Sequence, residues 1–355
     1  MKILHVIATM RVGGAQRLIA DLIPRFNQHY SNDVLVFLDT ENALVDSLRE
    51  NAINVFSLHH KNIYNPVIGI QLIKYIKQYD VVHVHLFPTI YFAAIASFFC
   101  KSNLVYTEHS TENRRRGKWY FKLLDKLFYS RYKKIISISE GTEAELKKWL
   151  NVDANDTRFI TINNGTDIKS FRNIQPSVHK DNDLTVKLMM VGRFAQAKDQ
   201  DTIIRALARL ESKYHLYLVG DGPRIDACKE LATDLHVGDR VHFLGMRGDV
   251  PQLVESCDIG IQSSHWEGFG LTAVELMAAG KPVIASRAAG LQQVVEGAGL
   301  LFDIGDDNQL AEHIRLLAED KDFYTKIADQ CSKRADAYDI NIMAEKYLQI
   351  YKLLS

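Results

Sequence analysis

The sequence lacks the features that mark several large functional classes. It has only four cysteines, spread along the chain with no C-x-x-C pair, which argues against a zinc site or a disulfide framework and favours a reducing compartment. It has no excess of either charge, because Lys plus Arg and Asp plus Glu both number 43, so the charge balance gives no indication of a nucleic-acid partner. Short-period repeats and low-complexity tracts are absent as well.

Long hydrophobic runs are also missing. The most apolar window, residues 86–100, contains Pro88 and is about 15 residues long, whereas a membrane span needs about 20. We therefore expect a core helix there. The N-terminal run, residues 1–8, is too short and too quickly interrupted for a signal peptide and is typical of a buried first strand. Together these observations predict a cytoplasmic protein.

What the chain does contain is a regular alternation of short apolar runs and helix-period segments. This alternation favours an α/β fold in which helices cover both faces of parallel sheets. The length of 355 residues suggests two domains of about 150 to 200 residues each. The predicted strands are residues 3–8, 34–38, 55–58, 81–85, 104–107, 135–138, 159–162, 187–191, 216–219, 241–244, 259–262, 283–285 and 300–302.

A domain boundary is predicted just after Asn163-Asn164-Gly165. Asn, Gly and Pro residues are concentrated between this point and about residue 183, and a new strand follows. We predict an N-terminal domain over 1–165, a C-terminal domain over 166–338, and a final helix, 339–355, that packs on the first domain. Two doubly wound domains would bind ligands outside the carboxyl ends of their strands, in a cleft between them.

The most informative motif is a pair of carboxylates, Glu267 and Glu275, on either side of a glycine turn that opens a predicted helix over 271–279. Free backbone N–H groups and the positive helix end make such a turn an anion site. Two carboxylates beside it would repel phosphate alone. They suit an anion that carries hydroxyl-rich groups on both sides, as a nucleotide sugar does, and the motif therefore predicts sugar-nucleotide chemistry.

Two further loops follow predicted strands and could bind phosphate. Arg193 and Lys198 can converge on one diphosphate, the first as a planar fork and the second as a point charge, although two solvated loop cations are the plain alternative. Gly13 and Gly14 open the first predicted helix, but their spacing is neither G-x-G-x-x-G nor a P-loop, and a structural tight turn is as good a reading. The absence of G-x-G-x-x-G makes a dehydrogenase the weakest option.

Histidines at predicted strands give a less specific signal. His109 follows a strand of the first domain and so faces the predicted cleft, where it can be catalytic or a structural hydrogen-bonding group. His83 and His85 alternate along a buried strand and look structural. No cluster of His, Asp and Glu has convincing metal-site spacing, so no metal is predicted.

A basic segment with interleaved aromatic and aliphatic residues runs from residue 114 to residue 134. It contains nine Lys or Arg and one acid, Asp125. Such a helix can lie on an anionic membrane surface, or it can turn an apolar stripe to the core and a basic face to solvent. The first reading is favoured by the arginine cluster. The residues predicted to form this membrane or acceptor surface are Arg114, Arg115, Arg116, Lys118, Trp119 and Lys122.

In their order along the chain these motifs resemble those of the GT-B glycosyltransferases, and specifically the retaining family 4 group, also called glycosyl transferases group 1, of the bacterial polysaccharide type. The resemblance covers essentially the whole chain and implies two Rossmann-like domains facing each other across a cleft. The motifs that carry it are Gly13-Gly14, Asn164-Gly165 with Phe171, Gly192-Arg193 with Lys198, and Glu267 to Glu275 with Gly-Phe-Gly-Leu between them.

The resemblance implies a role for each of the matched residues. Arg193 and Lys198 would hold the donor diphosphate and stabilise the departing nucleotide in place of a metal ion. Glu267 would bind hydroxyls of the transferred sugar, Glu275 the ribose, and His109 the sugar near its anomeric carbon. The remaining donor-binding residues would be Gly13, Gly14, Met246, Arg247, Phe269, Gly270, Leu271 and Thr272.

The implied reaction is transfer of a sugar from a nucleoside-diphosphate sugar, with UDP as the expected nucleotide, to a glycan or polyprenyl-linked acceptor at the inner membrane face. The resemblance also implies retention of the anomeric configuration and no need for a metal or other cofactor. Two alternatives stay open. A sugar-nucleotide epimerase would need an acid/base pair, for which only His109 and Glu108 are candidates. A non-catalytic scaffold would use the basic segment to bind a membrane or a partner.

Overall fold

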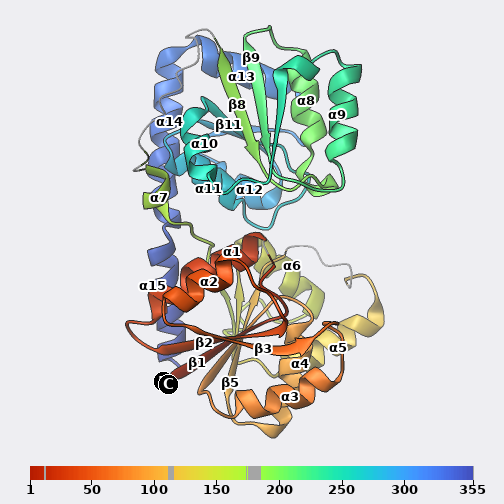
Figure 1. Cartoon of the computed structure of the whole chain (residues 1–355), viewed down its shortest axis with the longest axis vertical. Helices are drawn as coiled ribbons and strands as arrows, with labels where there is room; N and C mark the ends of the chain where they lie inside the picture. Colours follow the sequence, from red (N-terminus) through yellow and green to blue (C-terminus); the bar gives the residue numbers. More distant parts are fainter. Residues whose placement is uncertain (12, 111–115, 173, 175–184, 355) are drawn as a thin grey trace. The chain divides into compact units, whose positions relative to one another are not determined.

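The computed structural model describes residues 1–11, 13–110, 116–172, 174 and 185–354. The chain forms two compact units, one made of Met1–Asn164 together with Ile340–Ser355 and the other of Gly165–Asp339. Each unit contains a parallel β-sheet with helices on both faces (Figure 1), so the predicted α/β class is confirmed. The last helix belongs to the first unit, which is therefore built from both ends of the chain.

The sheet of the N-terminal unit has seven strands in the order β3-β2-β1-β4-β5-β6-β7, and every neighbouring pair is parallel. The strand order reverses between β1 and β4, which is where ligands bind in sheets of this type. The strands are β1 (Lys2–Ile7), β2 (Ser31–Leu38), β3 (Asn54–His60), β4 (Val81–His85), β5 (Asn103–Glu108), β6 (Lys134–Ser137) and β7 (Phe159–Thr161). The helices are α1 (Gly14–Leu22), α2 (Ala43–Glu50), α3 (Val67–Ile76), α4 (Thr89–Ala96), α5 (Trp119–Tyr129), α6 (Glu140–Leu150) and α15 (Ile340–Lys352).

The sheet of the C-terminal unit has six strands in the order β10-β9-β8-β11-β12-β13, again all parallel. Its order reverses between β8 and β11. The strands are β8 (Val186–Val191), β9 (Tyr214–Val219), β10 (Val241–Gly245), β11 (Ile259–Gln262), β12 (Val283–Ser286) and β13 (Leu300–Phe302). The helices are α7 (Ile168–Arg172), α8 (Gln200–Ala208), α9 (Ile225–Asp234), α10 (Val250–Ser256), α11 (Leu271–Ala278), α12 (Ala289–Val295), α13 (Asp307–Glu319) and α14 (Lys321–Ala335).

The elements follow from local sequence signals. All five residues of β4 are buried, as the near-continuous apolar runs of parallel strands require. The Ser139 hydroxyl caps α6 by accepting a hydrogen bond from Thr142 N at 3.1 Å. Helix α1 ends at Leu22 and is followed by a 3-10 turn, Ile23–Phe26, because Pro24 has no N–H with which to continue the α-helix.

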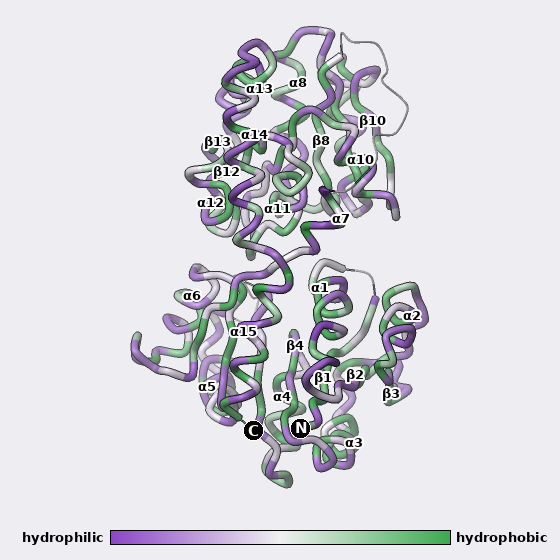
Figure 2. The backbone as a smooth tube through the Cα atoms, turned by 90° about the vertical axis from the view of Figure 1, so that its left-hand side faces the viewer, coloured by the Kyte–Doolittle hydropathy of each residue, from purple (hydrophilic) through white to green (hydrophobic). Residues whose placement is uncertain are grey.

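Helix α15 completes the core of the N-terminal unit. Hydrophobic and hydrophilic residues alternate along it (Figure 2), as expected of an amphipathic helix. Tyr347 and Tyr351 on its inner side are buried, and the Tyr351 ring lies edge-on to Phe26 at 5.4 Å. The Tyr351 hydroxyl also lies 2.6 Å from Nδ1 of His83 on β4. The final residues thus supply packing that β1 and β4 need. Among the described residues, no helix has both the length and the hydrophobicity needed to cross a membrane.

Candidate functional site

The predicted donor-binding residues of the C-terminal unit lie at the carboxyl edge of its sheet. Lys198 follows β8 and Glu267 follows β11, the two adjacent strands between which the strand order reverses. The loop after β9 borders them, since β9 pairs with β8. Sequence segments about 70 residues apart are therefore brought together because parallel strands end at the same edge.

The loop after β8 is held by backbone hydrogen bonds to the loop after β9. Gly192 N donates to Val219 O at 2.9 Å, and Phe194 N donates to Asp221 O at 3.0 Å. The Phe194 ring is buried and anchors the loop, whereas the neighbouring Arg193 is exposed. The structure thus fixes the backbone of Arg193 and leaves its guanidinium at the surface, where an anion can reach it.

Lys198 and Glu267 form an ion pair through Nζ and Oε2. The two side chains are only 21% and 18% exposed, so solvent screens the pair weakly. The segments that carry them are also joined through the backbone, because His265 N donates to Ala197 O at 2.9 Å and the Ser263 hydroxyl donates to Asp199 O at 2.7 Å. One cation and one carboxylate from separate sequence motifs therefore meet at one point.

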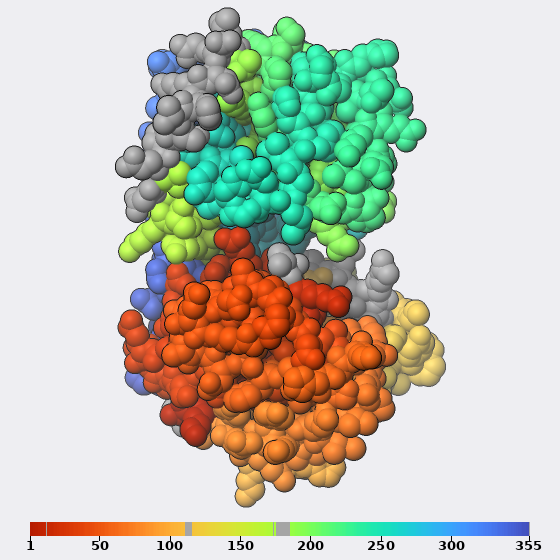
Figure 3. All heavy atoms as spheres, viewed as in Figure 1, coloured from red at the N-terminus to blue at the C-terminus, as the bar shows by residue number. Residues whose placement is uncertain are grey.

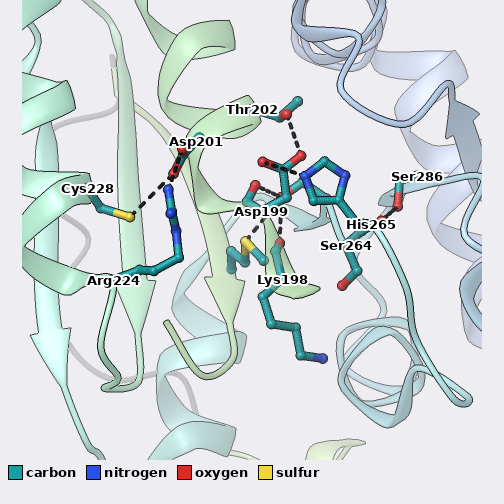
Figure 4. A network of polar contacts seen from close by, with 11 residues as sticks. Lys198, Asp199, Asp201, Thr202, Arg224, Cys228, Ser264, His265 and Ser286 are labelled. Carbon is teal, nitrogen blue, oxygen red and sulfur yellow. Dashed lines mark hydrogen bonds and ion pairs between the residues drawn. The ribbon is translucent and has the colours of Figure 1, made fainter. Parts of the chain in front are cut away.

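A layer of buried polar groups supports Lys198 from behind (Figure 4). Asp199 accepts a hydrogen bond from the Thr202 hydroxyl at 2.5 Å and lies 3.6 Å from Nε2 of His265. Burial raises the pKa of Asp199 above its usual range. The Lys198 side chain extends away from this layer in Figure 4. The backbone at Asp199 is left-handed, with φ of 51°, and this conformation turns the chain from the loop into α8.

A second pair lies next to this layer. Arg224 donates to Asp201 at 2.6 Å, and Cys228 Sγ lies 3.7 Å from the same carboxylate. Burial raises the pKa of the Cys228 thiol to about 12, so it stays protonated at neutral pH and is not a nucleophile.

The turn between the two carboxylates is rigid. Gly270 has φ of 99° and precedes α11, and a Cβ atom there would lie 2.6 Å from Leu291 Cδ2. A Cβ on Gly290 would lie 2.4 Å from Glu267 O, so only glycine allows the start of α12 to approach this turn. Phe269 is buried edge-on to Tyr338 at 5.2 Å. These contacts fix the turn, and Leu271, Thr272 and Glu275 follow it, half-buried, on α11.

The predicted donor-binding residues after β10, Met246 and Arg247, lie exposed at the surface. Met246 is 67% exposed. The Arg247 guanidinium is bound by Asp249 through two hydrogen bonds, of 2.7 and 2.6 Å, so a ligand would have to compete for it. The Met246 side chain and the loop backbone are therefore available without rearrangement, whereas the Arg247 guanidinium is not.

In the N-terminal unit the predicted residues again follow strands at the carboxyl edge. Gly13 and Gly14 follow β1, and His109 directly follows β5. Gly13 has an extended backbone with φ of −171°, and a Cβ on it would lie 2.6 Å from Oε1 of the flexible Gln16 side chain, which would have to move. A Cβ on Gly14 would meet no atom within 4 Å, so packing does not require glycine there. His109 is half-buried, and this environment lowers its pKa to about 4, which makes it neutral at physiological pH.

The structure corrects part of the predicted basic surface. Arg114 and Arg115 lie outside the described residues. Arg116 does not belong to an exposed surface, because its side chain is 15% exposed and its guanidinium lies 3.6 Å from the buried Glu108 carboxylate. Lys118 and Trp119 are exposed, and Lys122 is half-buried with its ammonium group 5.7 Å from the centre of the Trp149 ring.

Helix α5 also differs from the second alternative for this segment, in which an apolar stripe faces the core. Its buried residues are Asp125 and Tyr129. Asp125 accepts hydrogen bonds from Trp149 Nε1 at 2.8 Å and from the Tyr91 hydroxyl. In Figure 3 this part of the chain, drawn in pale yellow, projects from the N-terminal unit. The apolar residues that it exposes are Trp119, Tyr120, Leu123, Leu124 and Leu127.

Sequence reasoning missed several residues that shape the site. Gly220 and Gly222 both have positive φ, and Cβ atoms there would lie 2.2 Å from Gly192 O and 2.4 Å from Phe194 O. The signal was available, since Gly-Asp-Gly directly follows an apolar strand run. Asp199 and His265 gave no signal beyond their position beside Lys198 and Glu267, because their pairing is a tertiary contact.

A cavity of about 1050 Å³ lies elsewhere, at the amino edge of the N-terminal sheet. It is lined by Asp80 and Asn103 at the starts of β4 and β5 and by Leu354 near the chain end, among others. None of the predicted site residues lines it. In parallel α/β sheets ligands bind at the opposite, carboxyl edge, so we do not assign the site to this cavity.

Comparisons with known proteins match this chain to glycosyltransferases. The family described as Glycosyltransferase Family 4 matches residues 12–170, and Glycosyl transferases group 1 matches residues 171–337. A lipopolysaccharide core biosynthesis glycosyltransferase, LpsE of Rhizobium meliloti, is 34% identical over 46% of this chain and 48% of its own length. A Campylobacter jejuni N-acetylgalactosaminyltransferase that acts on a diphospho-undecaprenol substrate is 31% identical over 46% of this chain and 44% of its own length. The chain thus spans about half the length of these curated relatives.

Solved structures match along the whole chain. HepE of Anabaena, determined in complex with UDP and glucose, has a TM-score of 0.86 and 23% identity, and the match covers 99% of each chain. WaaG, a glycosyltransferase involved in lipopolysaccharide biosynthesis, has a TM-score of 0.74 and 17% identity over 98% of this chain and 99% of its own. At this identity the likeness establishes the fold, and it confirms the predicted GT-B class with two Rossmann-like domains.

Proposed function

Since the chain belongs to the group 1 glycosyltransferases of the GT-B fold, we propose that it transfers a hexosyl or N-acetylhexosaminyl group from a nucleoside-diphosphate sugar, with UDP as the nucleotide, to a glycan or lipid-linked acceptor. The observation that carries the proposal is the Lys198–Glu267 pair beside the rigid turn that opens α11. It provides a cation for the diphosphate and a carboxylate for sugar hydroxyls at one point. A phosphate site alone would not hold an acid there.

The proposed donor contacts follow from this geometry. The ammonium group of Lys198 and the exposed guanidinium of Arg193 bind the diphosphate, and the free N–H groups at the start of α11 add to the positive field. Glu267 accepts hydrogen bonds from sugar hydroxyls, and Glu275 on α11 accepts from the ribose. Gly13 and Gly14 let phosphate approach the backbone after β1, and His109 contacts the sugar. These roles rest on the motifs and on family membership.

For the reaction itself we propose retention without a metal ion. The bond from the anomeric carbon to the diphosphate oxygen breaks, the bond to the acceptor oxygen forms on the same face, and the acceptor proton passes to the departing phosphate. Positive charge develops on the sugar and negative charge on the phosphate. Arg193 and Lys198 stabilise the negative charge, which is the part that a metal ion would otherwise take.

The relatives suggest the acceptor class. LpsE is a glycosyltransferase of lipopolysaccharide core biosynthesis, and the Campylobacter relative is a transferase for a diphospho-undecaprenol-linked sugar. We propose a lipid-linked or growing surface glycan as the acceptor of this chain.

We also propose that α5 brings the protein to an anionic membrane surface. What supports this is the unusual outer face of the helix, where Trp119, Leu123 and Leu127 are 75%, 61% and 52% exposed among basic residues. At the end of the helix Arg131 lies 4.4 Å above the ring of Phe98, which is itself 56% exposed. Apolar side chains that insert between lipid headgroups and cations that meet lipid phosphates are the two components of interfacial binding.

The test is nucleotide release by the purified protein from a panel of UDP-, GDP- and ADP-sugars, with and without a detergent-solubilised polyprenyl-linked acceptor. We expect slow release of one nucleotide, acceleration by the acceptor, and no effect of EDTA. Loss of release in EDTA, restored by a divalent cation, would overturn the metal-free mechanism. Conversion of the donor sugar into its epimer without acceptor would favour the isomerase alternative, and tight donor binding without any turnover would favour a scaffold.

A further inference from the structure

Four histidines of the N-terminal unit lie close together across its central strands. His5 is on β1, His83 and His85 are on the adjacent β4, and His109 follows β5. His5, His83 and His85 are at most 3% exposed. Burial lowers the pKa of His5 to about 4 and those of His83 and His85 well below their usual range, so these imidazoles are neutral. A neutral imidazole has one nitrogen that donates a hydrogen bond and one that accepts.

Three of these rings form a chain of hydrogen bonds that starts at Asn32 on β2. His5 Nε2 lies 3.3 Å from Asn32 Oδ1, and His5 Nδ1 lies 3.3 Å from His85 Nε2. His85 Nδ1 in turn lies 3.4 Å from His109 Nε2. The distances alone allow the hydrogen bonds to run in either direction.

The direction is fixed at the Asn32 end. Its Nδ2 lies 2.8 Å from Tyr30 O and 3.1 Å from Asn27 Oδ1. A backbone carbonyl can only accept, so the amide nitrogen of Asn32 must face Tyr30 and its oxygen must face His5. The Asn27 amide is oriented in the same way, because its Nδ2 donates to Asn51 O at 2.9 Å.

Each ring then has only one consistent proton position. His5 carries its proton on Nε2, where it donates to Asn32, and accepts at Nδ1 from the Nε2–H of His85. His85 accepts at Nδ1 from the Nε2–H of His109. The Nδ1 atom of His109 keeps its lone pair, and none of the residues that the structure describes donates a hydrogen bond to it.

We propose that Asn32, His5 and His85 are positioning residues that hold His109 in the Nε2–H tautomer, so that its Nδ1 accepts a hydrogen bond from a hydroxyl of the sugar or of the acceptor. This role at the ligand rests on the proposed function, whereas the tautomer itself does not. A neutral ring that accepts a hydrogen bond orients a hydroxyl without adding positive charge beside a sugar that itself becomes positive during transfer. The opposite tautomer would present a donor to the same hydroxyl.

His83 offers a matched comparison. It is as deeply buried, and its ring centre lies 4.1 Å from that of His85. Its nitrogens, however, bind other partners, the Tyr351 hydroxyl at 2.6 Å and the Thr107 hydroxyl at 2.7 Å. Nitrogen atoms of His5, His83 and His85 also approach within 4.8 Å of one another, close enough to hold a metal ion. Since each of these nitrogens already has a hydrogen-bond partner, we assign a hydrogen-bonded chain in place of a metal site.

The experiment is two-bond ¹H–¹⁵N NMR on protein labelled in its histidine rings, which reports the tautomer of each ring. We expect the Nε2–H form for His109 in the wild type, a mixture or the Nδ1–H form in His5→Phe and Asn32→Leu, and no change in His83→Phe. Two variants at different links keep the test valid if one of them does not fold. The Nδ1–H form in the wild type, or an unchanged His109 in both variants, would overturn the proposal.

Kinetics and zinc binding complete the test. We expect kcat to fall about tenfold in His5→Phe with little change in the donor KM, and His83→Phe to keep its kcat. Equal kcat in the two variants would refute the positioning role. A protein that shows the expected tautomers but no transfer would refute the proposed function and leave the chain of hydrogen bonds intact. Stoichiometric zinc, bound by the wild type and lost equally in His5→Phe and His83→Phe, would replace the hydrogen-bonded chain with a metal site.

Discussion

At the scale of single residues, the position of Lys198 depends on contacts that its own motif does not contain. Its ammonium group is paired with Glu267, and its backbone is held by Ser263 and supported by the buried Asp199. The ion pair keeps Lys198 extended toward the proposed diphosphate site in the absence of a ligand. A long side chain that is already ordered loses less conformational entropy when it binds.

Replacing Lys198 with Ala is therefore expected to lower kcat/KM at least about 100-fold, because a preorganised cation for the departing phosphate is lost. The matched control is Lys147→Ala. Lys147 forms a comparable half-buried pair with Glu143 on α6, at 2.7 Å and with exposures of 16% and 19%, and neither residue is among those of the proposed site. Steady-state kinetics and unfolding curves of both variants make the comparison. Equal activity of the two variants would remove Lys198 from the mechanism.

Gly290 gives a second prediction at this scale. A Cβ atom there would lie 2.4 Å from Glu267 O and 2.8 Å from Phe269 N, so Gly290→Ala must displace the turn that carries Glu267. We expect at least a tenfold loss of kcat/KM, since displacements of about 1 Å near reacting groups can cost 100-fold. Gly238→Ala, where a Cβ would meet no atom within 4 Å, is the control. Full activity of Gly290→Ala in the same assay would show that the turn tolerates movement.

At the scale of elements, α5 combines a polar buried face with an apolar and basic outer face. Its place in the unit is fixed by Asp125, which accepts from Trp149 and Tyr91, and by the buried Tyr129. The residues of the outer face are therefore not needed to pack the helix against the core. Its exposed apolar side chains would be unfavourable on a helix that faces only water.

We expect Leu123→Ser together with Leu127→Ser to weaken binding to vesicles that contain anionic lipid at least tenfold, because two apolar contacts with the lipid interface are lost. Sedimentation of the protein with the vesicles measures the change. Ile70→Ser is the control, since Ile70 is 71% exposed on another helix, α3. Unchanged sedimentation of the double variant would refute the membrane role, and kinetics with a soluble acceptor should be the same for all three proteins.

Most elements could be predicted from the sequence, and the reasons are physical. Buried parallel strands are short apolar runs, and all thirteen predicted runs overlap observed strands, with ends that differ by at most a few residues. The Lys198–Glu267 pairing could be expected once both loops were placed at strand ends. For α5 the sequence left two readings open, a membrane-facing surface, which the arginine cluster favoured, and a core-facing apolar stripe, because a helical period of apolar residues does not reveal which face meets the core. The partners of Arg116 and the histidine chain are tertiary contacts between distant segments and left no local pattern.

At the scale of the whole molecule, the buried histidines of the N-terminal unit are expected to make its stability depend on pH. The N-terminal unit contains histidines whose pKa burial lowers, to about 4 for His5 and His109 and further for His83 and His85. At these four positions the unfolded chain takes up protons as the pH falls through 6.5, whereas the folded unit takes them up only at about pH 4 or below. The unfolded state therefore binds more protons in this window, and the unit loses stability as the pH falls from about 6.5 to 4.

We expect the urea midpoint of the N-terminal unit to fall between pH 7 and pH 5, with a contribution from His5 of up to about 3 kcal/mol across the whole window. Fluorescence in a Trp266→Phe background reports this unit, because the other two tryptophans, Trp119 and Trp149, belong to it. His5→Phe should reduce the slope of the midpoint against pH. A midpoint that does not change with pH, or a slope that His5→Phe leaves unchanged, would contradict the burial of neutral histidines.

The position of α15 has a consequence for synthesis of the chain on the ribosome. The C-terminal unit is one continuous segment, Gly165–Asp339, and all of it is made before α15. The N-terminal unit begins first but lacks Tyr347 and Tyr351 until α15 emerges, so His83 and Phe26 have no cover on that side in the nascent protein. The unit that is translated second can therefore reach its native fold first, whereas the unit that is begun first keeps part of its core open to chaperones until α15 has left the ribosome.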